Sequence, residues 1–285
     1  SGAVSSSAPY SNSSENAGGI AGNNGGTINN CRNSGTVYNG HYSSYAIAGG
    51  IAGVNNTGGT ISNCTNSGAV DASANAGGIA GSNGGAISNC TNSGTVSAKK
   101  VGGIVGCITK SGKVEYCLST VNIITGYYIG GVAGNIDTSA TISYCYYNDD
   151  ILSVKKAICN SEDTENVKGL STKELKDGTE LFSGSTSWVY KAGKYPILDH
   201  INFAITPSIT IDGNGVAKVS YTTAEEYKDY YDTVNYSWYK DGKKIKGETE
   251  KNYTLISGDE KSKISCKIYK TSVDNYCEAV VNVAN

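Results

Sequence analysis

The stretch AGGIAGSNGGAISNCTNSGTV, from Ala76 to Val96, decides the fold because the chain repeats it. Close copies occupy residues 17–37 and 48–70, and looser copies occupy residues 101–117 and 129–145. The second glycine of each Gly-Gly pair recurs every 25 to 31 residues, at Gly19, Gly50, Gly78, Gly103 and Gly131. Apolar alternation within such a unit, separated by Gly, Asn and Ser, is typical of one turn of a β-solenoid. The glycine content disfavours a helix.

Stacked units would place equivalent side chains in columns, with about 4.8 Å between coils. The predicted columns are Ile20, Ile51, Ile79, Ile104 and Val132; Ile28, Ile61, Ile87, Val114 and Ile142; Val37, Val70, Val96 and Val121; and Cys31, Cys64, Cys90, Cys117 and Cys145. In the first copy, three strands are expected, centred on Ile20, on Ile28 with Cys31, and on Val37. This pattern predicts a parallel β-helix, right-handed because parallel crossovers favour that hand.

The units resemble the GLUG-motif repeats, written here as GGIAG, GGIVG and GGVAG, with G-x-I-x-N-C and S-G-x-V downstream. The resemblance covers about half of the chain. Such repeats occur in bacterial surface proteins, adhesin-like proteins and noncatalytic parts of some IgA peptidases. The resemblance therefore implies a secreted or cell-surface bacterial protein, and it implies no particular ligand.

The first four residues, SGAV, match residues 67–70. This match predicts that the chain begins inside a sixth, truncated unit, with residues 5–16 as its connecting loop. A disordered Ser-rich tail is the alternative. The chain shows no signal peptide and contains no Met, so we expect a mature or trimmed chain.

Charge is scarce in the repeats, where Glu15, Arg32 and Asp71 are the only charged residues up to residue 98. A nearly uncharged Gly/Asn/Ser/Thr surface is typical of an extracellular solenoid. The net charge of −2 argues against a nucleic-acid partner. No apolar run approaches the roughly 20 residues of a membrane span, so no membrane insertion is expected. We expect a monomer.

The five stacked cysteines are expected to be reduced and buried as small apolar side chains. No C-x-x-C pair or nearby His supports zinc, so no metal and no cofactor are expected. Cys107 and Cys159 receive no role. Asparagines flank the cysteine column, and each set is predicted to form a ladder of side-chain amides: Asn30, Asn63 and Asn89 before it, and Asn33, Asn66 and Asn92 after it.

Two segments are candidates for ligand binding. The loop 38–46, YNGHYSSYA, is long and contains His41, which is interpreted as a solvated side chain and not as a catalyst. A second group is rich in tyrosine and has two alternative interpretations: a sugar-stacking patch, or aromatic packing where the solenoid meets its cap. Its members are Tyr116, Tyr127, Tyr128, Tyr144, Tyr146 and Tyr147.

Residues 151–202 leave the repeat and are predicted to cap the solenoid. Ser171 and Glu174 fit a capping box, which predicts a short helix over about residues 171–182. The apolar residues expected to cover the open core are Leu170, Leu175, Leu181, Phe182, Trp188, Tyr195, Ile197 and Leu198. The pattern of L-S/T-x-x-E-(L/M)-K, Trp and G-x-Y-P also resembles segments that close GLUG arrays.

Residues 203–285 contain short alternating strands with turns about every ten residues, as in a β-sandwich. WYKDGK, YTL and ISCKI resemble a bacterial Ig-like domain, which implies Trp238 in the core of strand C and Cys266 on strand F. The earlier strand carries Val219 and Tyr221 where an antibody domain has its other Cys. Cys266 and Cys277 are predicted either to pair with each other or to remain two free thiols.

The sequence thus predicts an all-β chain: a parallel β-helix solenoid (1–150), a short helical cap (151–202) and an Ig-like β-sandwich (203–285). Asp137, Asp149 and Asp150 lack an evident basic partner, and no nucleophile or metalloenzyme motif is visible, so no enzyme is expected. We expect a noncatalytic extracellular bacterial surface module that binds a glycan or host protein. The alternatives are the accessory region of a larger secreted peptidase or glycoside-active enzyme, and a passive spacer. No ligand-binding residue is assigned.

Overall fold

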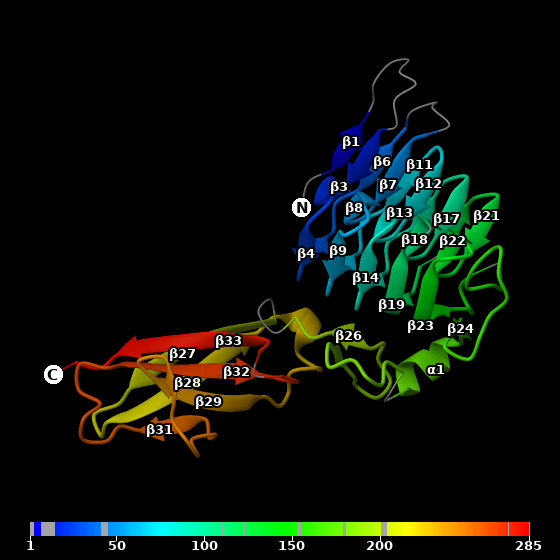
Figure 1. Cartoon of the computed structure of the whole chain (residues 1–285). Helices are drawn as coiled ribbons and strands as arrows, with labels where there is room; N and C mark the ends of the chain where they lie inside the picture. Colours follow the sequence, from blue (N-terminus) through cyan, green and yellow to red (C-terminus); the bar gives the residue numbers. More distant parts are fainter. Residues whose placement is uncertain are drawn as a thin grey trace. The chain divides into compact units, whose positions relative to one another are not determined.

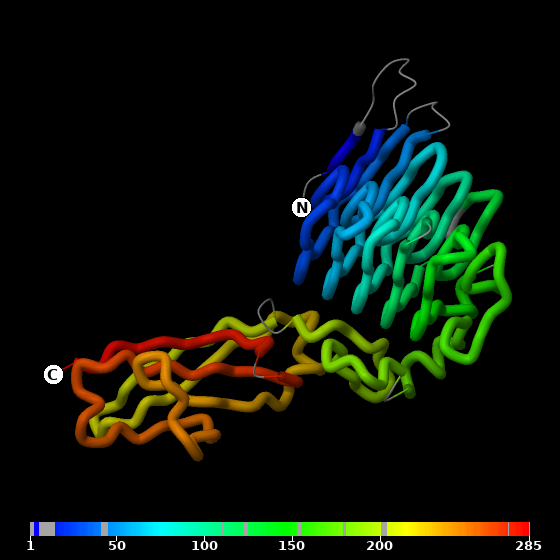
Figure 2. The backbone as a smooth tube through the Cα atoms, viewed as in Figure 1, coloured from blue at the N-terminus to red at the C-terminus, as the bar shows by residue number. Residues whose placement is uncertain are grey.

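The computed structural model describes residues 3–6, 15–40, 45–109, 111–121, 123–152, 155–178, 181–200, 204–272 and 274–284. Two compact units are present (Figures 1 and 2). The first comprises Ser1–Ser185 with Ala192–Leu198, and the second comprises Thr186–Lys191 with Asp199–Asn285.

The first unit is a parallel β-solenoid in which the chain winds through four stacks of short strands, as Figure 2 shows. The first stack contains β1 (Val4–Ser6), β6 (Val37–Asn39), β11 (Val70–Ala72), β16 (Val96–Ser97) and β20 (Ile123–Thr125). The second contains β2 (Asn16–Gly18), β7 (Ile47–Gly49), β12 (Asn75–Gly77), β17 (Lys100–Gly102) and β21 (Tyr128–Gly130). The third contains β3 (Ala21–Asn24), β8 (Ala52–Asn55), β13 (Ala80–Asn83), β18 (Val105–Ile108) and β22 (Ala133–Ile136).

The fourth stack is bent in each of the first three coils and continuous in the later ones. It contains β4 (Thr27–Asn29), β9 (Thr60–Ser62) and β14 (Ala86–Ser88), then β5 (Arg32–Asn33), β10 (Thr65–Asn66) and β15 (Thr91–Asn92), and finally β19 (Lys113–Ser119), β23 (Thr141–Asn148) and β24 (Val167–Leu170). A coil therefore has more strands than the predicted three. The strand predicted around Ile20 is wrong, because Ile20 lies in the bend between β2 and β3.

The predicted solenoid and most of its columns are confirmed. Ile51 donates its backbone N–H to the carbonyl of Ile79 at 3.0 Å, and Ile79 donates to Ile104 at 2.9 Å. All three side chains are fully buried, whereas Ile20, in the outermost described coil, is 47% exposed. The second column holds register from Ile28 to Ile142. The predicted right hand of the helix stays a prediction.

One residue of the predicted third column is wrong. Val96 pairs with Ile123, and not with the predicted Val121. Ile123 follows Cys117 by the same six residues that separate Val96 from Cys90 (123 − 117 = 96 − 90), so spacing from the cysteine sets the register. Val121 is nevertheless buried. At the other end Val4 pairs with Val37, and β1 places Ser5 in a strand and not in the predicted loop.

Close approach between coils explains the Gly-Gly pair. A Cβ on Gly78 would lie 2.1 Å from Cγ of Asn92 and 2.3 Å from the carbonyl oxygen of Gly103 in the next coil. On Gly50 it would lie 2.3 Å from Cγ of Asn66. The second glycine therefore leaves room for an inward-pointing asparagine, which no larger residue would do.

The solenoid's parallel pairing continues past residue 150 into the predicted cap. β24 pairs with β23, which places Val167 opposite Cys145. The helix α1 (Thr172–Asp177) follows, and its capping box is confirmed by bonds in both directions between Ser171 and Glu174. The helix is shorter than predicted because Gly178 is extended, with ψ of 118°.

Apolar residues of the cap are buried as expected, notably Leu175 and Phe182. The ring of Phe182 lies 5.5 Å from that of Tyr146. Asn148 at the end of β23 donates to the hydroxyl of Tyr195 at 2.6 Å. Trp188, predicted to be part of the cap, instead falls in the second unit. Two short strands, β25 (Trp188–Val189) and β26 (Ile197–Leu198), lie in this part of the sequence.

The second unit contains two antiparallel sheets consistent with the predicted sandwich. One has the order β27 (Ile205–Ile211), β28 (Val216–Thr223), β31 (Asn252–Thr254), and the other has β30 (Lys243–Lys244), β29 (Asn235–Lys240), β32 (Lys263–Tyr269), β33 (Tyr276–Asn282). A 3-10 helix, η1 (Glu225–Tyr227), connects them. Trp238 is fully buried opposite Cys266, and its indole N–H donates to the carbonyl of Glu250 at 2.8 Å.

Candidate ligand-binding surface

The buried asparagines stabilise the solenoid from inside and are not presented to a ligand. One predicted ladder is confirmed: Asn33 donates to Asn66 at 2.9 Å, and Asn66 donates to Asn92 at 2.8 Å. Each side-chain amide also forms hydrogen bonds with the glycine two residues later. Asn66, for example, accepts the N–H of Gly68 and donates to its carbonyl. The ladder therefore couples neighbouring coils and fixes a turn in each coil.

A second ladder was not predicted. Asn24 donates to Asn55 and Asn55 to Asn83, both at 2.8 Å. The signal in the sequence was the asparagine that precedes Gly-Gly in the first and third copies, which resembled an ordinary turn residue. In the next coil Ile108 occupies the position of Asn83, and the ladder ends there.

The other predicted ladder is wrong. Asn30, Asn63 and Asn89 adopt left-handed backbone conformations, with φ of 53°, 51° and 49°. Asparagine tolerates this region better than most residues. Tyr116 and Tyr144 occupy the equivalent position with φ of 53° and 50°. The position is a bend, and its side chains do not form an amide chain.

Four of the five column cysteines are buried, as predicted, whereas Cys31 is half-buried. All nine cysteines are free. In each coil the thiol donates to the carbonyl two residues earlier, across the bend, as Cys64 does to Ser62 at 3.0 Å and Cys90 to Ser88 at 3.2 Å. The neighbouring thiol of Cys90 and burial raise the pKa of Cys64, and burial raises the pKa of Cys117. Cys64 and Cys117 therefore stay protonated at neutral pH, and a buried, protonated thiol is a poor nucleophile.

Cys266 and Cys277 are two free, buried thiols, so the alternative of a bridge is not realised. Cys266 lies opposite Ala279, and Cys277 lies opposite Ile268. Burial raises the pKa of Cys266 to about 12 and that of Cys277 to about 11. Among the described residues, no group of three or more His, Cys, Asp or Glu side chains is placed to hold a metal ion.

Two of the three acids that the sequence offers for catalysis, Asp137 and Asp150, accept backbone N–H groups. Asp150 accepts the N–H of Thr172 at 2.7 Å at the start of the cap helix, and Asp137 accepts the N–H of Ser139 at 3.2 Å. Hydrogen bonds from Thr172 lower the pKa of Asp150. His41 of the loop 38–46 lies outside the described residues.

The tyrosine-rich group divides between its two interpretations. Tyr146 and Tyr147 are buried, as aromatic packing predicts. Tyr116 and Tyr144 stack on each other, with ring centroids 5.0 Å apart and planes at 7°. Tyr127 and Tyr128, by contrast, are 85% and 45% exposed. These two tyrosines are available to a ligand.

Four exposed tyrosines follow one edge of the solenoid, where the chain passes from the first strand stack to the second. We call them the tyrosine ridge: Tyr38, Tyr45, Tyr127 and Tyr128. Tyr38 and Tyr45 are 48% and 58% exposed. In the second stack, Ile47 just after Tyr45 aligns with Asn75, then Lys100, then Tyr128. Three coil steps therefore separate the two tyrosine pairs, a span of about 14 Å.

Two lysines lie beside the second tyrosine pair. Lys100 pairs in register with Tyr128, and the carbonyl of Lys99 accepts the N–H groups of Tyr127 and Tyr128 at 2.9 and 3.1 Å. Neither ammonium group forms an ion pair with a described residue. Among the described strands of the first stack, the only charged residue is Asp71, in register with Tyr38. The pKa of Asp71 is raised by burial.

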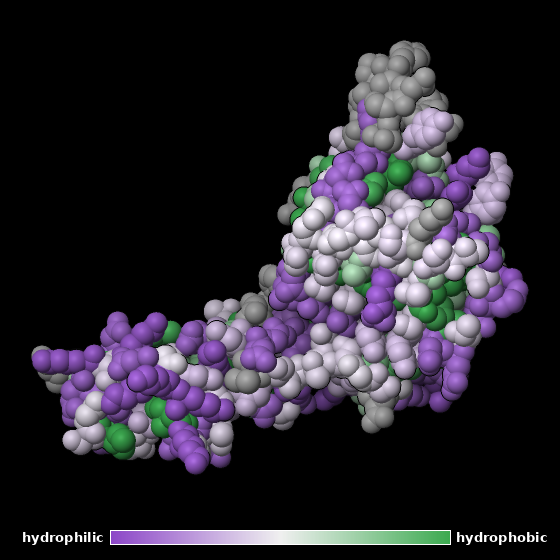
Figure 3. Space-filling model, in the orientation of Figure 1, coloured by the Kyte–Doolittle hydropathy of each residue, from purple (hydrophilic) through white to green (hydrophobic). Residues whose placement is uncertain are grey.

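On the face shown in Figure 3, hydrophobic residues form small separate patches among polar ones. An isolated exposed aromatic is common, but a line of four on one edge is a candidate for recognition.

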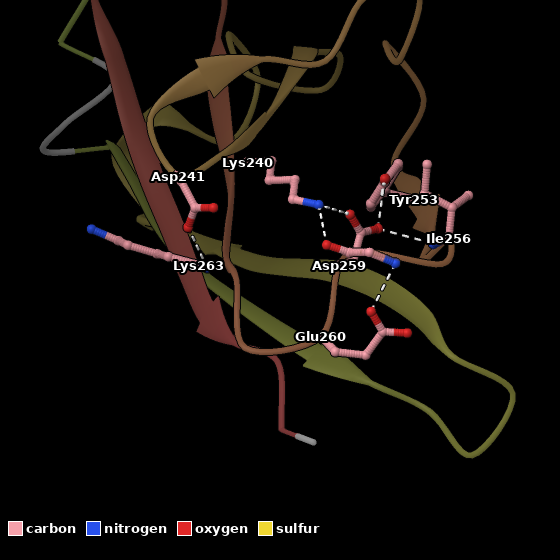
Figure 4. A network of polar contacts seen from close by, with 8 residues as sticks. Lys240, Asp241, Tyr253, Ile256, Asp259, Glu260 and Lys263 are labelled. Carbon is pink, nitrogen blue, oxygen red and sulfur yellow. Dashed lines mark hydrogen bonds and ion pairs between the residues drawn. The ribbon is translucent and has the colours of Figure 1, made fainter.

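The charged clusters of the second unit are structural. Asp259, whose side chain is 2% exposed, accepts from Lys240, from the hydroxyl of Tyr253 and from the N–H of Ile256 at 2.8 to 2.9 Å (Figure 4). Asp199 similarly accepts the hydroxyl of Tyr231 at 2.9 Å and bonds to Thr271. Both carboxylates are satisfied by the protein itself and hold loops in place.

The fold and surface together define an all-β protein with a parallel solenoid followed by antiparallel sheets. A family model described as the GLUG motif matches residues 72–97, which span the third copy of the repeat. This match supports a GLUG-repeat protein and is compatible with an extracellular repeat module. No curated protein and no solved structure matches the chain. In the part of the chain that the structure describes, no helix is long and apolar enough to cross a membrane.

Proposed function

We propose that the chain is a noncatalytic, extracellular bacterial surface module that binds a glycan or an extracellular protein through the tyrosine ridge. The observation that supports this function is the alignment of four exposed tyrosines on one edge of an otherwise small-residue, polar solenoid. Tyrosine offers an apolar ring together with a polar hydroxyl and loses little conformational entropy on binding. The GLUG motif at residues 72–97 agrees with an extracellular location.

The second unit is proposed to be an Ig-like domain. Its sheet orders, β27-β28-β31 and β30-β29-β32-β33, correspond to strands A-B-E and C′-C-F-G of that fold. The buried Trp238 on the third strand, in register with Cys266, supports this proposal. Modules of this kind support a role in display on a surface, and the chain is expected to be a monomer.

The test is binding of the whole chain to panels of glycans and extracellular-matrix proteins. At least one ligand should bind, and binding should fall when Tyr38, Tyr45, Tyr127 and Tyr128 are all changed to Ser. A control variant should carry Ser at Tyr239 and Tyr276, which lie on the second unit. Failure of every ligand to bind would favour the passive spacer, and an activity that depends on further domains would favour the accessory region of an enzyme.

A further inference from the structure

The end of the tyrosine ridge at Lys99, Lys100, Tyr127 and Tyr128 combines two chemistries on adjacent coils. Two lysines, whose ammonium groups have no ion-pair partner among the described residues, lie on the coil next to that of two exposed tyrosines. Elsewhere in the solenoid, Lys113 has its ammonium 2.9 Å from Glu115. The pair at residues 99 and 100 is therefore a positive site that the solenoid leaves uncompensated.

We infer that this end of the ridge binds an acidic polysaccharide, whose carboxylate or sulfate groups pair with Lys99 and Lys100 while its sugar rings stack on Tyr127 and Tyr128. This inference rests on the proposed function and narrows its ligand class. The anions of the ligand would replace the water around the ammonium groups of the exposed Lys99 and the half-buried Lys100, and the tyrosine rings would cover the apolar faces of the sugar units.

The length of the tyrosine ridge favours a polysaccharide over a short sugar as the ligand. The second tyrosine pair, Tyr38 and Tyr45, continues the same edge about 14 Å away, which an extended chain can reach. Asp71 aligns with Tyr38 at that end, so the charged groups of the ligand are held at the lysines and its uncharged faces at the first tyrosine pair.

Other polyanions fit less well. Two lysines are fewer than the cluster of about four to eight basic residues that anionic membranes require. A nucleic acid would need several phosphate contacts, whereas this edge also carries Asp71 and the chain has a net charge of −2. A saccharide that carries a charge on some of its units matches the number of lysines and the presence of tyrosines.

The experiment measures binding of the full chain to polygalacturonate, heparin, neutral dextran and poly-L-glutamate at low and high salt. Binding to one or both acidic polysaccharides, weakened by salt, is expected, with little binding to dextran. Polygalacturonate and heparin distinguish carboxylate from sulfate. Equal binding to poly-L-glutamate would contradict the proposal that the ligand is a saccharide. Preference for dextran would contradict the proposal that the ligand is an anion.

Substitutions at the lysines and tyrosines test which residues contact the polysaccharide. The double change Lys99→Gln and Lys100→Gln should weaken binding roughly tenfold, as expected for two exposed ion pairs, whereas Lys99→Arg with Lys100→Arg should retain it. Lys113→Gln is the matched control, because it removes one charge from a paired lysine of the same solenoid. Tyr127→Ser with Tyr128→Ser should weaken binding at both salt concentrations.

The two proposals fail differently. If the chain binds a neutral glycan or a protein through the four tyrosines, the proposed function stands and the acidic polysaccharide is excluded. If the lysine changes have no more effect than Lys113→Gln, this inference is wrong even where an acidic polysaccharide binds. Unchanged thermal unfolding of each variant establishes that the effect is on binding and not on folding.

Discussion

Single side chains inside the solenoid decide whether a coil can stack, and the asparagine ladder is the clearest case. Asn66 is fully buried, accepts from Asn33, donates to Asn92 and also bonds both polar groups of Gly68. Removing its amide would leave several buried groups without a partner, and each such group costs about 1–3 kcal/mol.

We therefore expect Asn66→Ala to lower the free energy of unfolding of the solenoid by about 3 kcal/mol. Asn33→Ala, at the end of the same ladder, should cost less, because it removes one ladder bond and not two. Denaturant unfolding followed by circular dichroism measures both. Equal losses for the two variants would show that the ladder does not act as a connected chain.

The glycine facing the ladder gives a second prediction at this scale. Gly78→Ala places a methyl group 2.1 Å from Cγ of Asn92 and against the backbone of the next coil, so it should destabilise the solenoid by about 3 kcal/mol or more. Gly25→Ala has no atom within 4 Å of the added Cβ and serves as the control. A Gly78→Ala protein as stable as the Gly25→Ala protein would contradict this account of the Gly-Gly pair.

Strands and columns were largely predictable from the sequence because a repeat reveals equivalent positions without knowledge of their structure. The spacing of the repeat alone predicted the Ile, Val and Cys columns and the ladder of Asn33, Asn66 and Asn92. Spacing could not distinguish an inward asparagine from one at a left-handed bend, so Asn30, Asn63 and Asn89 were misassigned and Asn24, Asn55 and Asn83 were missed. Where the fourth copy changes its letters after Cys117, Val121 was assigned to the column although Ile123 has the spacing from the cysteine found in the earlier copies.

The candidate surface was predictable only in part. The sequence placed Tyr127 and Tyr128 with four other tyrosines, but exposure depends on which side of a strand or bend a residue occupies. The structure separates these two from the buried Tyr146 and Tyr147. The alignment of Tyr128 with Lys100 also required the register between coils.

The cysteine column gives a prediction for a whole element. Cys64, Cys90, Cys117 and Cys145 are fully buried, so we expect a thiol-alkylating reagent to leave them unmodified in the native protein, whereas the half-buried Cys31, Cys107 and Cys159 react. The neighbouring thiol of Cys90 and burial raise the pKa of Cys64, so alkaline pH up to about 9 should not make Cys64 reactive. Mass spectrometry of labelled peptides, before and after unfolding, identifies the sites. Early labelling of Cys90 would contradict a closed column.

At the scale of the whole molecule, each unit has its own core, so we expect two unfolding transitions by calorimetry. Gly78→Ala should lower the midpoint of the solenoid transition and leave that of the sandwich within experimental error. A single transition that shifts as a whole would show that the units unfold together.

Acid should destabilise the sandwich through Asp259. Burial tends to raise the pKa of Asp259, but the Ile256 N–H, Lys240 and Tyr253 more than offset it, so its pKa is lowered. A lowered folded-state pKa means that the stabilisation is present above the unfolded value of about 3.9 and is lost as pH falls through the folded value. At pH 7, the midpoint of the sandwich's unfolding transition should therefore be lower for Asp259→Asn than for the native protein. Between pH 5 and pH 2, this midpoint should fall less for the variant than for the native protein. Glu278→Gln, on an exposed side chain, is the control.

The bend that precedes each column cysteine has a practical consequence. Its backbone keeps φ between 49° and 53° whether the residue is Asn or Tyr. The chain can therefore change the chemistry displayed once per coil without disturbing the thiol behind it. An engineer could therefore vary the side chain at this bend from coil to coil, beginning with the exposed Asn30.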